Sequence, residues 1–154
     1  MSTSGEGRWG SREAEILGVE FIRKDGSAAY VFESGEAVEI RLRVRANQPL
    51  RDFVFGVGIF SAEGVACYGT NTDIEGAQPE EFHGDAIVGF QIDHLWLVAG
   101  SYKVDVAVHR KNGAPYDYHR HLYTIRVTSP LKETGIFRPP HRWTFSSGIR
   151  ISGL

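Results

Sequence analysis

Residues 68–72 concentrate side chains that bind hydroxyl groups. They read Tyr-Gly-Thr-Asn-Thr, so a phenol, two hydroxyls and an amide fall within five residues. Neutral donors and acceptors beside an aromatic ring suit an uncharged, hydroxyl-rich ligand. The pattern therefore favours a sugar-binding surface that uses Tyr68, Thr70, Asn71 and Thr72. Asn71 also tolerates left-handed backbone conformations, so a turn or a bulge is the alternative interpretation of the same residues.

A second cluster of polar and aromatic residues begins at Tyr116 and reads Tyr-Asp-Tyr-His-Arg-His. Tyr116, Tyr118 and His119 could contact a sugar together with His109, and a structural role for the tyrosines beside a loop is the alternative. His119 and His121 are two residues apart, so we expect them to share one face of a strand. A zinc site needs three or four converging ligands and the spacing fixes only two, so no metal site is predicted.

The acidic residues do not point to an enzyme. Asp93 and Asp105 could be drawn as a glycosidase pair, whose carboxyls lie about 5–10 Å apart. However, 19 acidic residues in a chain of 154 supply such pairs by chance. The sequence lacks a nucleophile elbow, a histidine–glutamate zinc motif and a glycine-rich nucleotide loop. We therefore predict a non-catalytic protein that uses no cofactor.

The charge pattern argues against nucleic acid as a partner. The formal net charge is −2 and the charged residues are scattered. Arg41, Arg43 and Arg45 would form a stripe on one sheet face, where they could pair with an acidic or phosphate-modified glycan or simply be solvated. No apolar run approaches the ~20 residues of a membrane-spanning helix, and the first residues contain no apolar signal-peptide core. The chain is therefore expected to be cytoplasmic, with its lone cysteine, Cys67, as a small buried hydrophobe.

Period-2 alternation and regular turns predict strands along most of the chain. Two apolar runs at 53–60 and 65–72 flank a turn at Gly64, where positive φ suits a hairpin. Turn signals recur about every ten residues, which is typical of an all-β sandwich with antiparallel sheets. The expected inward-facing residues are Ile40, Leu42, Val44, Ala86, Val88, Phe90, Ile92, Tyr102, Val104, Val106, Val108, Tyr123, Ile125 and Val127. Lys103, Asp105 and His109 would then point outward.

Residues 129–154 differ from the rest because prolines interrupt regular structure repeatedly. Beyond Pro140, the aromatic sequence around His141, Trp143 and Phe145 predicts a short strand. A lone terminal strand must pair with a sheet edge, either of its own domain or of a partner. We expect a leader at 1–10, a β-sandwich at 11–128 and a C-terminal arm and strand at 129–154.

Several segments together resemble one known family, the C-terminal polysaccharide-binding domain of Wzt-type ABC transporter ATPases. The resemblance runs from about residue 8 to residue 145. The segments that carry it are Arg-Trp-Gly-Ser-Arg-Glu-Ala-Glu-Ile from Arg8, Phe-Glu-Ser-Gly-Glu from Phe32, Phe-Gly-Val from Phe55, Tyr-Gly-Thr-Asn-Thr from Tyr68, and Leu-Trp-Leu-Val-Ala-Gly-Ser-Tyr from Leu95.

The resemblance implies an immunoglobulin-like sandwich that binds a finished O-antigen-like surface polysaccharide for export. It implies a homodimer that exchanges the strand of His141, Trp143 and Phe145. It also implies as partners an ABC transporter ATPase or the membrane subunit of the exporter, which would place the domain peripherally at the inner membrane. The chain departs from the family's usual proteins in having no phosphate-binding loop, so it cannot hydrolyse ATP by that mechanism. The alternative is a structural or dimerisation sandwich without a ligand. A glycoside hydrolase is the third and weakest interpretation.

Overall fold

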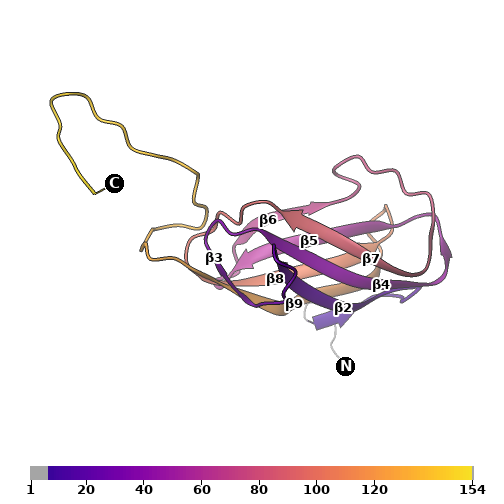
Figure 1. Ribbon diagram of the computed structural model, residues 1–154. Coiled ribbons are helices and arrows are strands. Elements are labelled where there is room, and N and C mark those ends of the chain that lie inside the picture. Colours follow the sequence, from indigo (N-terminus) through magenta and orange to yellow (C-terminus); the bar gives the residue numbers. More distant parts are fainter. Residues whose placement is uncertain (1–6, 154) are drawn as a thin grey trace.

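The structure, a computed structural model, describes residues 7–153 and folds them into two facing β-sheets without a helix (Figure 1). The strands are β1 (Gly7–Trp9), β2 (Ala14–Arg23), β3 (Val31–Glu33), β4 (Val38–Leu50), β5 (Val54–Ser61), β6 (Ala66–Asn71), β7 (Phe82–Ile92), β8 (Gly100–His109) and β9 (Pro115–Thr128). One sheet has the order β1-β9-β8-β5-β6, with β3 pairing in parallel with β9. The other has the order β2-β4-β7. The prediction of an all-β protein with two antiparallel sheets is confirmed, and the parallel pairing of β3 with β9 is an addition to it.

The core lies between the sheets and follows the predicted alternation closely. On β4, Ile40 and Val44 are each 1% exposed, whereas Arg43 between them is exposed. Alternate residues of β8, including Val104 and Val106, are fully buried against them. The predicted core residues Val88, Phe90, Ile92 and Tyr123 are half-buried and pack against the margin of this cluster. Period-2 patterning therefore places most of the core correctly.

One predicted core position, Ala86, is exposed. Ala86 lies on β7 and pairs with Val44 of β4, so its direction is as expected. However, β7 is an edge strand, with a neighbour on one side only, and Ala86 is not part of the packed core. The alternation gives the direction of a side chain, but burial also requires a covering layer.

A bulge in β9 overturns the expectation that His119 and His121 share a face. Val104 pairs with Tyr123 and Val106 with His119, so β9 holds two extra residues opposite β8, and His121 adopts a φ of 56°. His119 faces the core and is 3% exposed. His121 lies on the outer face instead.

Asp105 points to that outer face as predicted, yet it is only 4% exposed. The backbone N–H of His121 donates to its Oδ1 at 2.7 Å, and the His121 ring lies 2.9 Å from the same oxygen. The hydroxyl of Tyr118 donates to Oδ2 at 3.2 Å. The carboxylate is therefore occupied by neighbours of its own sheet.

Segments near both ends of the described chain contact the sandwich. Of the expected leader, Gly7–Trp9 forms β1 and pairs with β9, while the remainder up to residue 6 lies outside the described residues. At the other end, Val98 donates its N–H to the carbonyl of Ile136 at 2.8 Å, and Arg138 donates to the carbonyl of Trp96 at 2.9 Å. Beyond this contact the arm leaves the sandwich (Figure 1).

Residues 141–145 form no strand in the described part of this single chain. Trp143 is 68% exposed and stacks on Phe145 with ring centres 6.4 Å apart. The structure therefore does not show the alternative, in which this segment folds back onto the sheet edge of its own domain. Its apolar rings remain without a sheet to cover them.

Candidate functional site

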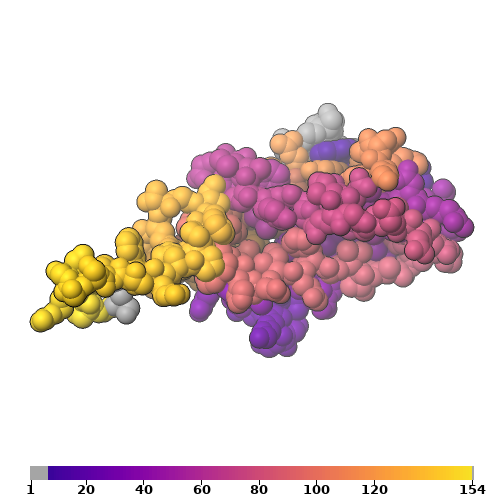
Figure 2. All heavy atoms as spheres, turned by 90° about the horizontal axis from the view of Figure 1, so that it is seen from above, coloured from indigo at the N-terminus to yellow at the C-terminus, as the bar shows by residue number. Residues whose placement is uncertain are grey.

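A groove runs along the open side of the sandwich, between the edge strands β6 and β7. Figure 2 views this side, with the magenta β5–β6 hairpin lying beside the salmon β7 and the segment that follows it. The groove consists of two cavities of about 420 and 400 Å³, which share Phe90 and Gln91 in their walls. The first also contains Thr70, Asn71, Thr72 and Glu75, and the second contains Cys67, Tyr68, His94, Trp96 and Phe137. We call this feature the β6–β7 groove.

The second cavity is lined by aliphatic side chains and by the rings of Tyr68, Phe90, His94, Trp96 and Phe137. Tyr68 projects from β6 and is 57% exposed. Trp96 faces the same cavity, and its indole rests directly on Gly35, where an added Cβ would lie 2.5 Å from the ring. The His94 ring stacks on Trp96 at 5.7 Å, and the Arg138 guanidinium lies 5.8 Å from its centre. These contacts hold Trp96 in a fixed position, as a stacking surface for a ligand requires.

The polar residues after Tyr68 do structural work as well as lining the groove. Asn71 Oδ1 accepts a hydrogen bond from the N–H of Ile74 at 2.7 Å, and Thr72 Oγ1 accepts one from the N–H of Phe55 at 3.1 Å. The Thr70 hydroxyl donates to Glu75 Oε2 at 2.8 Å. These bonds build the turn at 72–76, as the turn interpretation of the motif expects, and they hold Glu75 at the groove.

The other predicted contact residues lie elsewhere. Tyr116 is 1% exposed, and its hydroxyl donates to the carbonyl of Asp52 at 2.7 Å, so no ligand reaches it in this structure. His119 is buried in the same way. Tyr118 lies on the outer face of the larger sheet, stacked on Trp9 at 4.7 Å. His109 ends β8, with Nδ1 2.6 Å from the carbonyl of Arg110. The structure thus brings together Tyr68, Thr70, Asn71 and Thr72, and separates the other four from them.

Sequence reasoning missed three groove residues: Glu75, Gln91 and Trp96. Gln91 lies in a predicted strand and Trp96 in the segment after it. The spacing of neither residue predicts a place in the groove. The sequence did hold a signal for Glu75. An asparagine such as Asn71 often caps a turn, and the turn fixes the positions of the residues just after it. No group of three metal-binding side chains occurs within residues 7–153.

The arginine stripe of Arg41, Arg43 and Arg45 lies outside the groove, on the outer face of β4. Arg41 pairs with Glu39 at 3.1 Å and Arg45 with Asp85 at 2.7 Å. These hydrogen bonds raise the pKa of both guanidinium groups. Two of the three charges are thus neutralised by neighbours, as on an ordinary solvated sheet face. By contrast, the described residues that line the groove include one carboxylate, that of Glu75, and no lysine or arginine.

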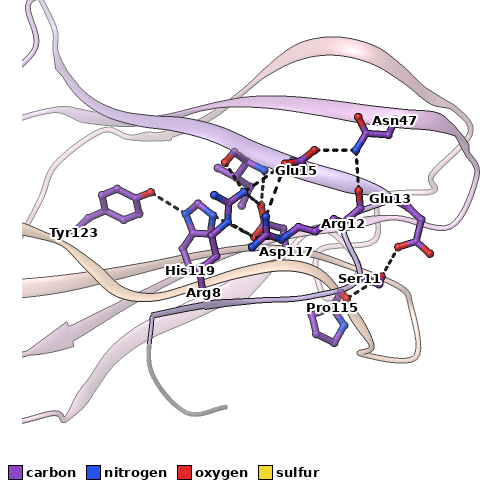
Figure 3. A network of polar contacts seen from close by, with 11 residues as sticks. Arg8, Ser11, Arg12, Glu13, Glu15, Asn47, Pro115, Asp117, His119 and Tyr123 are labelled. Atoms are coloured by element: carbon purple, nitrogen blue, oxygen red, sulfur yellow. Dashed lines mark hydrogen bonds and ion pairs between the residues drawn. The ribbon is translucent and has the colours of Figure 1, made fainter. Parts of the chain in front are cut away.

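A polar network ties β1 and β2 to β9, at the edge of the two sheets opposite to β6 and β7 (Figure 3). Asp117 is fully buried and accepts two hydrogen bonds from Arg8, at 2.8 and 2.7 Å, and one from the N–H of Ile16 at 2.8 Å. His119 Nε2 lies 3.3 Å from Asp117, and its Nδ1 lies 2.8 Å from the Tyr123 hydroxyl. Burial alone raises the pKa of Asp117, but His119, Arg8 and the Ile16 N–H outweigh it and lower the pKa to about 2. The Asp117 carboxylate and the His119 ring are closed to solvent, so the centre of this network is structural.

Three comparisons with known proteins agree. The family model described as the Wzt C-terminal domain matches residues 5–139. The chain is 27% identical over 130 residues to the O-antigen export system ATP-binding protein RfbB of Myxococcus xanthus, a match that covers 84% of this chain and 29% of that protein. The chain therefore spans less than a third of that relative's length. A crystal structure of the C-terminal domain of Wzt superposes with a TM-score of 0.82 at 19% identity, covering 94% of this chain and 90% of the other, which shows a common fold.

Proposed function

The chain belongs to the Wzt C-terminal domain family, and we propose that it binds a bacterial surface polysaccharide in the β6–β7 groove as a non-catalytic module of an export system. The relative's name, an ATP-binding protein for O-antigen export, supports this choice of ligand and setting. It also supports an ABC transporter ATPase or membrane subunit as the partner, and a cytoplasmic location at the inner membrane. No helix within residues 7–153 is long and apolar enough to span a bilayer.

The observation that carries the proposal is the meeting of rings and neutral polar groups in one groove. Tyr68 offers an exposed ring, on which the C–H face of a pyranose can pack, and Trp96 lines the same cavity. Gln91 lies between the two cavities and supplies an amide, while Thr70 stands on the opposite wall. Apolar walls with a few placed polar groups are typical of small-molecule sites. A ligand-free structural sandwich would not require them.

The expected affinity is weak. Each neutral hydrogen bond that replaces one with water contributes only ~0.5–1.5 kcal/mol net. A few such bonds with ring packing correspond to micromolar to millimolar dissociation constants. Two sites in a dimer would raise the effective affinity for a repeating polymer without any new contact.

The proposal includes a homodimer in which residues 141–145 pair with the sheet edge of a second, immunoglobulin-like sandwich. In the single chain Trp143 and Phe145 are exposed, next to His141, and have no cover. Burial of Phe145 would contribute roughly 1.5–3 kcal/mol and the larger indole somewhat more, before ordering costs. A twofold axis would supply two such contacts, which together would favour the dimer.

The test is an array of bacterial surface polysaccharides probed with the wild-type protein and two variants. Tyr68→Ala should weaken binding at least tenfold, because it removes a ring from the groove. Tyr30→Ala is the matched control, since Tyr30 is similarly exposed, at 63%, but lies on the β2–β3 connection. It should bind like the wild type. A folded, dimeric wild-type protein that binds no polysaccharide would contradict the proposal and favour the alternative of a dimerisation module.

A further inference from the structure

We propose that Glu75 makes the β6–β7 groove selective for uncharged glycan segments. Its carboxylate accepts hydrogen bonds from sugar hydroxyls and repels units that bear a carboxylate or a phosphate. The inference rests on the proposed function and goes further, since it names the class of glycan and the residue that selects it.

The turn at 72–76 positions the carboxylate firmly. Glu75 donates its N–H to the carbonyl of Asn71 at 3.2 Å, and Ala77 donates to the carbonyl of Thr72 at 2.9 Å. On the side chain, the Thr70 hydroxyl binds Oε2 at 2.8 Å. Oε1 has no hydrogen bond among the described residues, and Glu75 is an exposed residue in the wall of the groove. One oxygen thus fixes the carboxylate and the other is free to accept a hydroxyl.

The charge of the groove decides which glycans it admits. A hydrogen bond from a sugar hydroxyl to an ionised carboxylate is stronger than one between neutral groups. An anionic sugar would meet the Glu75 charge in a largely apolar groove, without a lysine or arginine among its described lining residues to compensate. Beside the turn, Lys111 faces Asp73 at 3.8 Å, so that cation is already paired. Arg138, whose guanidinium lies 5.8 Å from the centre of the Trp96 ring, is paired with Glu133 at 2.7 Å. The three arginines of β4 lie on another face, and two of them are paired as well.

The experiment compares one polysaccharide in two charge states. The probe is the neutral polysaccharide that binds most tightly on the array, used as such and after TEMPO oxidation of its primary hydroxyls to carboxylates. Wild-type protein should bind the oxidised form at least tenfold more weakly. Glu75→Gln should bind the neutral form about threefold to tenfold more weakly, and should bind the two forms within about threefold of each other. Glu63→Gln, a glutamate of the β5–β6 turn outside the groove, is the matched control and should behave like the wild type.

Salt separates charge repulsion from a steric effect of oxidation. If repulsion by Glu75 causes the discrimination, it should shrink for the wild type as NaCl rises from about 20 to about 500 mM, because screening shortens the range of the interaction. Discrimination that persists unchanged in Glu75→Gln would overturn the inference, and so would an array whose strongest ligands are acidic. Binding without charge discrimination contradicts only the role of Glu75, whereas no binding of any polysaccharide contradicts the proposed function and this inference together.

Discussion

Replacement of Asp117 by asparagine should remove a stabilisation that depends on pH in a defined way. The Asp117 carboxylate is fully buried, with its pKa lowered from 3.8 to about 2. At roughly 1.4 kcal/mol per pH unit, its ionisation adds about 2.4 kcal/mol to the free energy of unfolding at pH 7. Because the folded-state pKa is the lower one, this contribution is present above about pH 4 and is lost as the pH falls toward 2. The linkage relation gives about 1.3 kcal/mol at pH 3 and about 0.4 kcal/mol at pH 2.

Urea unfolding followed by tryptophan fluorescence at pH 7, 4, 3 and 2 measures this directly. The wild type should be about 2–3 kcal/mol more stable than Asp117→Asn at pH 7, since the variant leaves Arg8 without its carboxylate partner. The difference should nearly vanish at pH 2. Asp85→Asn is the control, because Asp85 also pairs with an arginine and has a lowered pKa, but its side chain is 69% exposed. A constant difference between the wild type and Asp117→Asn from pH 7 to pH 2 would refute the reasoning.

Three further outcomes follow from the structure. Tyr116→Phe should lose about 1 kcal/mol of stability, measured by urea unfolding, through the lost bond to Asp52, and leave polysaccharide binding unchanged; weaker binding would place Tyr116 at the site after all. Deletion of residues 141–154 should convert a dimer to a monomer in light scattering, and a full-length chain that is monomeric at tens of micromolar would exclude strand exchange. Cys67, whose pKa is raised by burial, should react slowly with iodoacetamide at pH 8, and saturating polysaccharide should slow it further because Cys67 lines the cavity of Tyr68; an unchanged rate would argue against that cavity.

The sheets could be predicted from the sequence because their signals are local. Alternation along β4 gives the direction of every side chain from Val38 to Val44, and Gly64, with a φ of +88°, closes the predicted hairpin. The bulge in β9 could not be predicted in the same way. The bulge inserts two residues, an even number, so His119 and Tyr123 still face the core as the alternation predicts. Only His121, between them, turns to the other face.

The candidate site was predicted in part. The motif from Tyr68 marked one wall of the groove, since phenol, hydroxyl and amide groups cluster there in sequence. The opposite wall, with Gln91 and Trp96, comes from β7 and the segment after it, and only the packing of the two sheets brings it near. Tyr116 was misplaced for a related reason. A tyrosine side chain can line a ligand site or make a buried hydrogen bond. Only the tertiary structure shows that Tyr116 does the second.

The proposal that the β6–β7 groove holds the glycan can be tested with the three tryptophans of the chain. Trp96 lines the groove, Trp9 stacks on Tyr118 on the outer face of the larger sheet, and Trp143 lies on the arm. Their indole N–H signals in a ¹⁵N correlation spectrum, assigned with single Trp→Phe variants, report on three separate places. Titration with the polysaccharide should shift the Trp96 signal and leave that of Trp9 unchanged. A saturating titration that moves Trp9 and leaves Trp96 in place would contradict the account.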